Sequence, residues 1–95
     1  MPLSAVYRKA ADVLQERGWC RHYLKNDAGN MCIWGAVSFV VDGDPFKATN
    51  ETRNMLTPLE QFTDGQGVID WNNTMGRTQR QAISLLRKAS KAIAA

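Results

Sequence analysis

The sequence has few of the residues that carry chemistry in enzymes and metal sites. Its 95 residues include one histidine and two cysteines, with no Cys-x-x-Cys pair of the kind that holds structural zinc. A phosphate-binding glycine loop is also missing, because Gly65-Gln66-Gly67 is too short and precedes no strand–helix unit. The acidic residues are scattered and suggest no catalytic pair. We therefore expect a binding protein rather than an enzyme, and no cofactor.

Long hydrophobic runs are missing too. The longest, residues 31–41, is interrupted by Gly35 and Ser38 and falls short of the roughly 18 residues that cross a membrane. The N-terminal residues show no basic stretch followed by an apolar one, so we expect no secretory signal. These absences predict a cytoplasmic protein with no membrane partner, in which Cys20 and Cys32 are thiols. On export, the same pair could close one disulfide.

A single domain over residues 1–95 is expected, since a chain of 95 residues leaves little room for a second core. The net charge is +3, and it is unevenly distributed. Residues 42–70 carry two Lys/Arg and six Asp/Glu, whereas residues 71–95 carry five Lys/Arg and no acid. The basic end could bind nucleic acid or an acidic protein. The small net charge favours the other interpretation, that the two segments fold together and largely cancel.

Helical periodicity predicts an all-α or nearly all-α bundle of three to four helices. The first helix, over residues 5–17, has Ser4 as its expected N-cap and Gly18 as its stop. The last helix follows Thr78, and Gln81 three residues later completes a capping box. We expect these two helices to pack together. Their apolar faces are Val6, Ala10, Val13 and Leu14 in the first and Ala82, Leu85, Leu86, Ala89 and Ile93 in the last.

The apolar residues 31–41 fit either a buried helix or a strand, because their length suits both. Gly35 beside Ala36 costs a strand more than a closely packed helix, so we favour the helix. A short extended segment could form over residues 19–24 or residues 68–71. The first and last helices should pack over the 31–41 segment.

Two short helices are expected in the acidic middle. Residues 49–56 show a polar helical pattern. Thr57 then fits an N-cap, followed by Pro58 at a position that suits the first helical turn. Glu60 fits the acid of a capping box, which predicts a further short helix ending near Phe62.

The last helix carries a basic face opposite its apolar one. A face of this kind can follow phosphates or dock on an acidic protein groove, and it is also what a solvated helix presents. Reading of DNA bases would need Asn or Gln on the same face, but Gln79 and Gln81 only flank it. The residues concerned are Arg80, Ser84, Arg87 and Lys91, with Arg77 just before the cap.

Three tryptophans could line a ligand cage, although in a small core they more often supply bulk. They are Trp19, Trp34 and Trp71. Trp71 precedes two asparagines in a glycine-rich neighbourhood, so it is the best candidate for partial exposure. We therefore place it with the partner-binding residues.

Cys20, His22 and Cys32 are the candidates for a thiol or metal site. Structural zinc needs four ligands, and Asp27 is the only fourth in reach of the pattern. A Cys20–His22 nucleophile and base would need a third group to orient the imidazole. Asp70, Asn72 and Asn73 are candidates for that group, although nothing in the sequence places them nearby. The simpler interpretation makes both cysteines small buried hydrophobes.

A series of short motifs resembles a small uncharacterised family found in actinobacteria and in the phages that infect them, over roughly residues 5–90. That family tends to have Trp-Asn-Asp where this chain has two asparagines, so a role of the aspartate does not carry over. The resemblance implies a cytoplasmic actinobacterial or phage-encoded protein and no particular activity. The motifs are Arg17-Gly18-Trp19-Cys20, Gly29, Cys32, Gly35-Ala36, Trp71-Asn72-Asn73 and Arg77-Thr78.

The leading hypothesis is a protein-binding module that modulates a host or cellular protein. Nucleic-acid binding through the same basic face is the first alternative, and a thiol or metal site at Cys20, His22 and Cys32 is the second. The residues expected to contact a partner are Arg77, Arg80, Arg87, Lys91 and Trp71.

Overall fold

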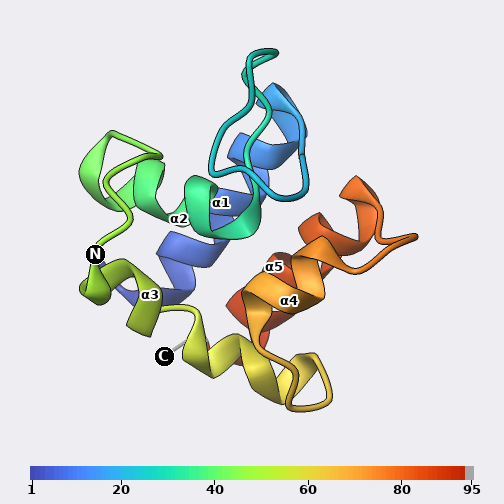
Figure 1. Cartoon of the computed structure of the whole chain (residues 1–95). Helices are drawn as coiled ribbons and strands as arrows, with labels where there is room; N and C mark the ends of the chain where they lie inside the picture. Colours follow the sequence, from blue (N-terminus) through green and yellow to red (C-terminus); the bar gives the residue numbers. More distant parts are fainter. Residues whose placement is uncertain (94–95) are drawn as a thin grey trace.

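A computed structural model describes residues 1–93, which form five α-helices and one 3-10 helix (Figure 1). The nearly all-α prediction is confirmed, with more helices than the three to four expected. Within residues 1–93 there is no strand, only isolated bridges of Met31 to Trp19 and to Lys25. The helices are α1 (Leu3–Arg17), α2 (Ile33–Asp42), α3 (Asn50–Asn54), η1 (Thr57–Phe62), α4 (Val68–Asn73) and α5 (Gln79–Ala92).

Three segments were ambiguous between a helix and an extended chain, and the structure shows which state each adopts. The segment 31–41 is helical as α2, which begins two residues later than the apolar run. Residues 68–71 belong to α4, so the extended alternative for them is wrong. Residues 19–24 form no strand, because only Trp19 among them makes an isolated bridge, to Met31. No helix within residues 1–93 has both the length and the apolar character needed to cross a membrane.

The helix α1 packs against both α5 and α2. It runs antiparallel to α5, and a side chain of α5 bonds the backbone of α1 near each end. At one end Gln79 Nε2 donates to Leu14 O at 2.9 Å, and at the other Ser90 Oγ donates to Ser4 O at 2.8 Å. The predicted apolar faces therefore meet in one core. Its fully buried residues include Tyr7, Ala10, Leu14, Ile33, Val37, Leu59, Ala82, Leu86 and Ala89.

Two of the expected caps are wrong. Ser4 lies inside α1, whose N-cap is Pro2, and no side chain caps that end. The Pro2 carbonyl instead accepts from the backbone of the first turn. Thr57 is likewise the first residue of η1, whose N-cap Leu56 has no side-chain bond. A capping residue type raises the chance of a helix start, but these two helices begin after Pro2 and Leu56 without a side-chain cap.

Other helix ends match their residues. Thr78 and Gln81 form the predicted capping box of α5, with bonds of 3.2 Å and 3.0 Å. Gly18 ends α1 at φ 91°, a positive angle that favours glycine. The N-cap of α2 is Cys32, whose Sγ accepts from the Gly35 backbone N–H at 3.3 Å. This last cap is not a residue type that sequence rules anticipate.

Gly35 allows two backbones to approach closely. A Cβ atom at this position would lie 1.9 Å from the carbonyl oxygen of Leu24. Only glycine therefore lets the first turn of α2 rest against the irregular 19–25 segment. This contact fixes the segment that carries Cys20 and His22.

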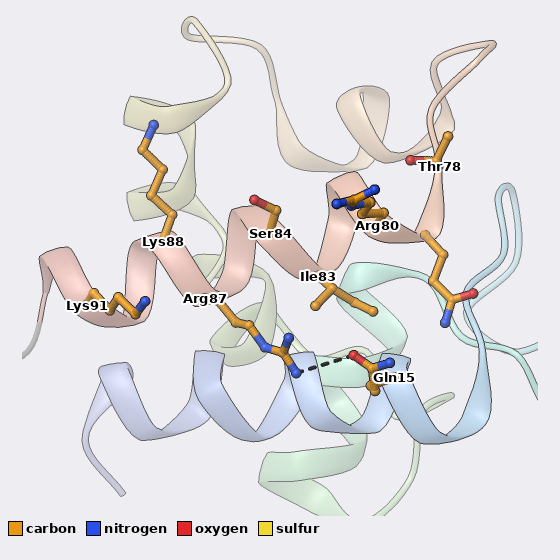
Figure 2. Close-up of a pocket in the computed structure, with 9 residues that line it drawn as sticks. Gln15, Thr78, Arg80, Ile83, Ser84, Arg87, Lys88 and Lys91 are labelled. Carbon is orange, nitrogen blue, oxygen red and sulfur yellow. Dashed lines mark hydrogen bonds between the residues drawn. The ribbon is translucent and has the colours of Figure 1, made fainter.

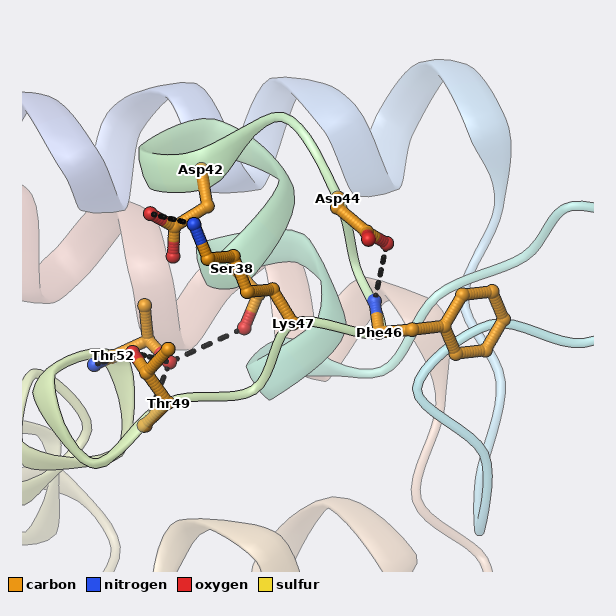
Figure 3. A network of polar contacts seen from close by, with 7 residues as sticks. All are labelled: Ser38, Asp42, Asp44, Phe46, Lys47, Thr49 and Thr52. Carbon is orange, nitrogen blue, oxygen red and sulfur yellow. Dashed lines mark hydrogen bonds and ion pairs between the residues drawn. The ribbon is translucent and has the colours of Figure 1, made fainter.

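The link from α2 to α3 is held by polar contacts (Figure 3). Thr52 is buried and its Oγ1 accepts from Ser38 Oγ at 3.3 Å and donates to Thr49 O at 3.0 Å. Thr49 also caps α3. On the outside, Lys47 Nζ lies 3.9 Å from Asp42 Oδ1. The polar pattern of residues 49–56 is thus partly internal rather than wholly solvated.

Candidate functional site

A groove of about 930 Å³ follows α5 on its exposed side and is bounded by α1 (Figure 2). We call it the α5 groove. Its cations are exposed, the largely buried Ile83 contributes an apolar side chain to its floor, and Gln15 of α1 closes one wall. No carboxylate lines it within residues 1–93. The cations are Arg80, Arg87, Lys88 and Lys91.

Three of the predicted partner-binding residues meet in this groove. Arg80 and Lys91 make no hydrogen bond or ion pair with any residue of the 1–93 range. Figure 2 shows Arg87 reaching from α5 to Gln15, at 3.4 Å, and its Nη2 lies 3.7 Å from Asp12 Oδ1. Because this ion pair is solvent-exposed, it contributes little and leaves Arg87 free to turn to another anion. Sequence reasoning missed Lys88, although it stands four residues after Ser84 on the same helix.

The other two predicted residues lie apart from the groove. The Arg77 guanidinium lies 3.9 Å from the centre of the Trp71 ring, and its Nε donates to Trp71 O at 3.0 Å. This pair is half-buried and joins α4 to the start of α5. It borders a shallower hollow of about 380 Å³ across α5, together with Phe62 and Lys88. The predicted basic residues are therefore divided between two surfaces, the α5 groove and this second hollow, which meet along α5.

The acidic middle segment does not pair with the basic helix. Within residues 1–93 the ion pairs are Lys47–Asp42 and Arg87–Asp12. Neither joins an acid of residues 42–70 to a cation of α5. The expected mutual cancellation is therefore not made through direct ion pairs, and the α5 groove keeps its positive charge.

The thiols of Cys20 and Cys32 are used inside the fold. Cys20 Sγ donates to Tyr23 O and Asn30 O, each at 3.3 Å, and Cys32 Sγ caps α2. Burial raises the pKa of both thiols, so the thiolate that a nucleophile needs is disfavoured at neutral pH. Within residues 1–93, no three His, Cys, Asp or Glu side chains gather as a metal site would require.

Asn72 has a role that sequence reasoning missed. Its buried Oδ1 accepts from Trp19 Nε1 at 2.7 Å and from the Ile33 backbone N–H at 3.1 Å. Its Nδ2 donates to Cys20 O at 3.2 Å and to Asn73 Oδ1 at 3.1 Å. One amide thus ties α4 to the 19–20 segment and to the start of α2. The asparagines considered as orienters for an imidazole bind the backbone instead.

His22 is attached to the same cluster through its backbone. Its N–H donates to Asn73 Oδ1 at 2.8 Å. The residue has φ 72°, a left-handed conformation that is uncommon outside glycine. We call Trp19, Asn72 and Asn73, with the backbone groups that they bind, the Asn72 cluster.

The chain belongs to a family of unknown function, DUF6197, whose model matches residues 1–92. This agrees with the expectation of an uncharacterised family over most of the chain. No curated protein and no solved structure matches the sequence.

Proposed function

We propose that this protein is a small binding module that holds an acidic segment of a partner protein in the α5 groove. The observation that carries the proposal is the set of four exposed cations with no lining carboxylate within residues 1–93. Such a surface attracts acidic groups over several ångströms and raises the rate of encounter. A partner would therefore bind faster at low ionic strength.

The apolar and amide residues of the groove favour a protein over nucleic acid. The 7% of the Ile83 surface that remains exposed adds a small apolar contact to the floor of the groove, which suits a peptide side chain. The amides that could read bases are already engaged, because Gln79 bonds Leu14 O and Gln81 bonds the Thr78 N–H. A groove with four cations also neutralises few phosphates.

The sequence resemblance adds a biological context to this proposal. A phage-encoded or actinobacterial protein of this size would act in the cytoplasm by occupying an acidic surface of a host or cellular protein. The compact fold and the buried thiols are compatible with such an accessory role.

A pull-down from actinobacterial lysate tests the groove directly. The bait is the tagged full chain, with and without nuclease, and bound proteins are identified by mass spectrometry. The groove variant carries Arg80→Glu, Arg87→Glu and Lys91→Glu. We expect one dominant protein that survives nuclease and is lost with the groove variant.

The control variant carries Lys25→Glu, Lys47→Glu and Arg53→Glu, which changes the net charge equally at exposed positions outside the groove. It should retain the partner. Capture that disappears with nuclease would assign the groove to nucleic acid. Equal loss with both variants would reduce the effect to net charge and refute a specific site.

A further inference from the structure

A second cavity lies where the irregular 22–24 segment meets the start of α2 and one side of α4. Its volume is about 180 Å³, and it shares no lining residue with the α5 groove. One wall comes from each of the three segments, so the Asn72 cluster and the Gly35 contact set its shape. The apolar walls are formed by Leu24, Ile33, Trp34, Val68 and Ile69.

The polar groups of Asn72, Trp34 and Cys32 in these walls are already bonded within the chain. Both ends of the Asn72 amide have partners, and Trp34 Nε1 donates to Thr52 Oγ1 at 3.1 Å. The Cys32 thiol caps α2 through Gly35. A water molecule inside would find few hydrogen bonds, and ordered water is stable in cavities only where it finds several. The walls therefore favour an apolar occupant.

At the rim, the His22 imidazole, the Tyr23 hydroxyl and the Asn73 Nδ2 have no hydrogen-bond partner within residues 1–93, and of these Asn73 is the one whose side chain is oriented by other bonds. Asn73 Oδ1 accepts from the His22 N–H and from Asn72 Nδ2, which fixes the orientation of the amide. Its Nδ2 makes no hydrogen bond within residues 1–93, and Asn73 is one of the residues that line the cavity. The left-handed backbone of His22 is held beside it, and such conformations concentrate at ligand-clamping sites.

We propose that this cavity binds a small aromatic molecule that carries one hydrogen-bond acceptor. The ring lies against Trp34 and Ile69, and the acceptor receives a hydrogen bond from Asn73 Nδ2. The volume slightly exceeds the roughly 150 Å³ of an apolar cavity that holds benzene. One six-membered ring with a short substituent therefore fills it. This site is separate from the α5 groove, so each proposal stands or fails by itself.

Two matched probes test the cavity in the isotope-labelled full chain by NMR titration. Acetophenone supplies one ring and one carbonyl acceptor, and ethylbenzene supplies the ring alone. We expect saturable shifts at Ile69, Asn73 and Trp34 with both probes. Acetophenone should bind about two- to tenfold more tightly, as one neutral hydrogen bond predicts.

Two variants separate the walls from the anchor. Asn73→Asp keeps an oxygen for the His22 N–H and Asn72 Nδ2 but removes the free donor, so acetophenone should lose its advantage. Ile69→Trp fills the cavity and should abolish binding of both probes. Arg80→Gln, in the α5 groove, should leave both affinities unchanged.

Absence of saturable shifts at the cavity in the wild-type chain would overturn the proposal. Binding that persists in a folded Ile69→Trp variant would also place the probes elsewhere. If Ile69→Trp does not fold, Asn73→Asp decides, since an unchanged ratio of the two affinities refutes the proposed anchor.

Discussion

The Asn72 cluster and the α5 groove are both rich in polar groups, but they use them differently. In the cluster, every polar atom of the central amide is bonded to another part of the chain. In the groove, Arg80 and Lys91 have no partner within residues 1–93. Bonded and buried groups hold the fold together, whereas exposed and unpaired ones are available to a partner. Substitutions in the two regions should therefore affect different measurements.

The largest loss of stability is expected from Asn72→Leu. This change keeps the volume but leaves the Trp19 Nε1–H, the Ile33 N–H and the Cys20 carbonyl without their partner. We expect the free energy of unfolding to fall by about 3–5 kcal/mol, measured by urea denaturation. Asn54→Leu, at an exposed asparagine of α3, should change it by less than about 0.5 kcal/mol. Similar effects at both positions would contradict the clustered role of Asn72.

The next effect concerns pH and Tyr7, whose hydroxyl donates to Met55 O at 2.6 Å in the core. Burial raises the pKa of Tyr7 from 10.0 to about 12. When folding raises the pKa of a group, the group contributes its full stabilisation at pH values below its pKa in the unfolded state. That stabilisation is lost as the pH rises through its pKa in the folded state. Between pH 10 and pH 12 the wild-type chain should lose about 2–3 kcal/mol through this group. Tyr7→Phe, less stable by about 1 kcal/mol at neutral pH, should lack that alkaline loss.

Gly35→Ala tests the backbone approach that shapes the second cavity. Alanine favours a helix by about 1 kcal/mol over glycine, but its Cβ would collide with the Leu24 carbonyl. We expect the collision to dominate, with a net loss of about 2 kcal/mol in thermal or urea unfolding. Gly67→Ala, at the N-cap of α4, is the control for steric space alone, because a Cβ there meets nothing within 4 Å. A stabilised Gly35→Ala variant would show that the approach can relax.

Thr78→Ala removes the α5 capping box and should cost about 1 kcal/mol. Ser4→Ala should cost much less, because the Ser4 side chain caps nothing and only its carbonyl is bonded. Urea denaturation of the two variants measures the difference. Equal losses would restore Ser4 as a cap and contradict the observed start of α1.

The smallest effect on stability is expected in the α5 groove. Arg80→Gln with Lys91→Gln should change the free energy of unfolding by less than about 0.5 kcal/mol, because both side chains are exposed and unpaired. The same pair of changes should weaken the partner bound to the groove and flatten its dependence on salt. A large loss of stability with unchanged binding would show that these groove residues stabilise the fold and do not bind the partner.

Local rules predicted the elements whose sequence signals agree with one another. The capping box at Thr78 and the apolar stripe of α5 specify the same helix, and both are observed. The helix over residues 68–73 was not predicted, because six residues give no clear period and its Asn72 bonds are made across 52 and 53 residues of chain. Helix starts also differed where a residue outside the capping preferences, such as Pro2 or Cys32, took the position.

The candidate site was predicted in part for the same reason. The face that holds Arg80, Arg87 and Lys91 follows from helical spacing alone. Arg77 and Trp71 lie on another surface because of the turn between α4 and α5. The helical spacing of residues in the sequence does not describe that turn. The second cavity forms where three segments meet in the fold, so no local sequence pattern predicted it.

The pairing of α1 with α5 has a consequence for biosynthesis. The helix α1 is synthesised before α5 and packs mainly against it, and bonds such as Ser90 to Ser4 join residues 86 positions apart. Until α5 has been made, α2 can cover only part of the apolar face of α1, and the part that α5 covers stays exposed. Contacts between distant residues form slowly, and exposed apolar surface favours aggregation while the chain waits. The nascent protein therefore depends on α5 to cover this apolar surface and prevent misassembly.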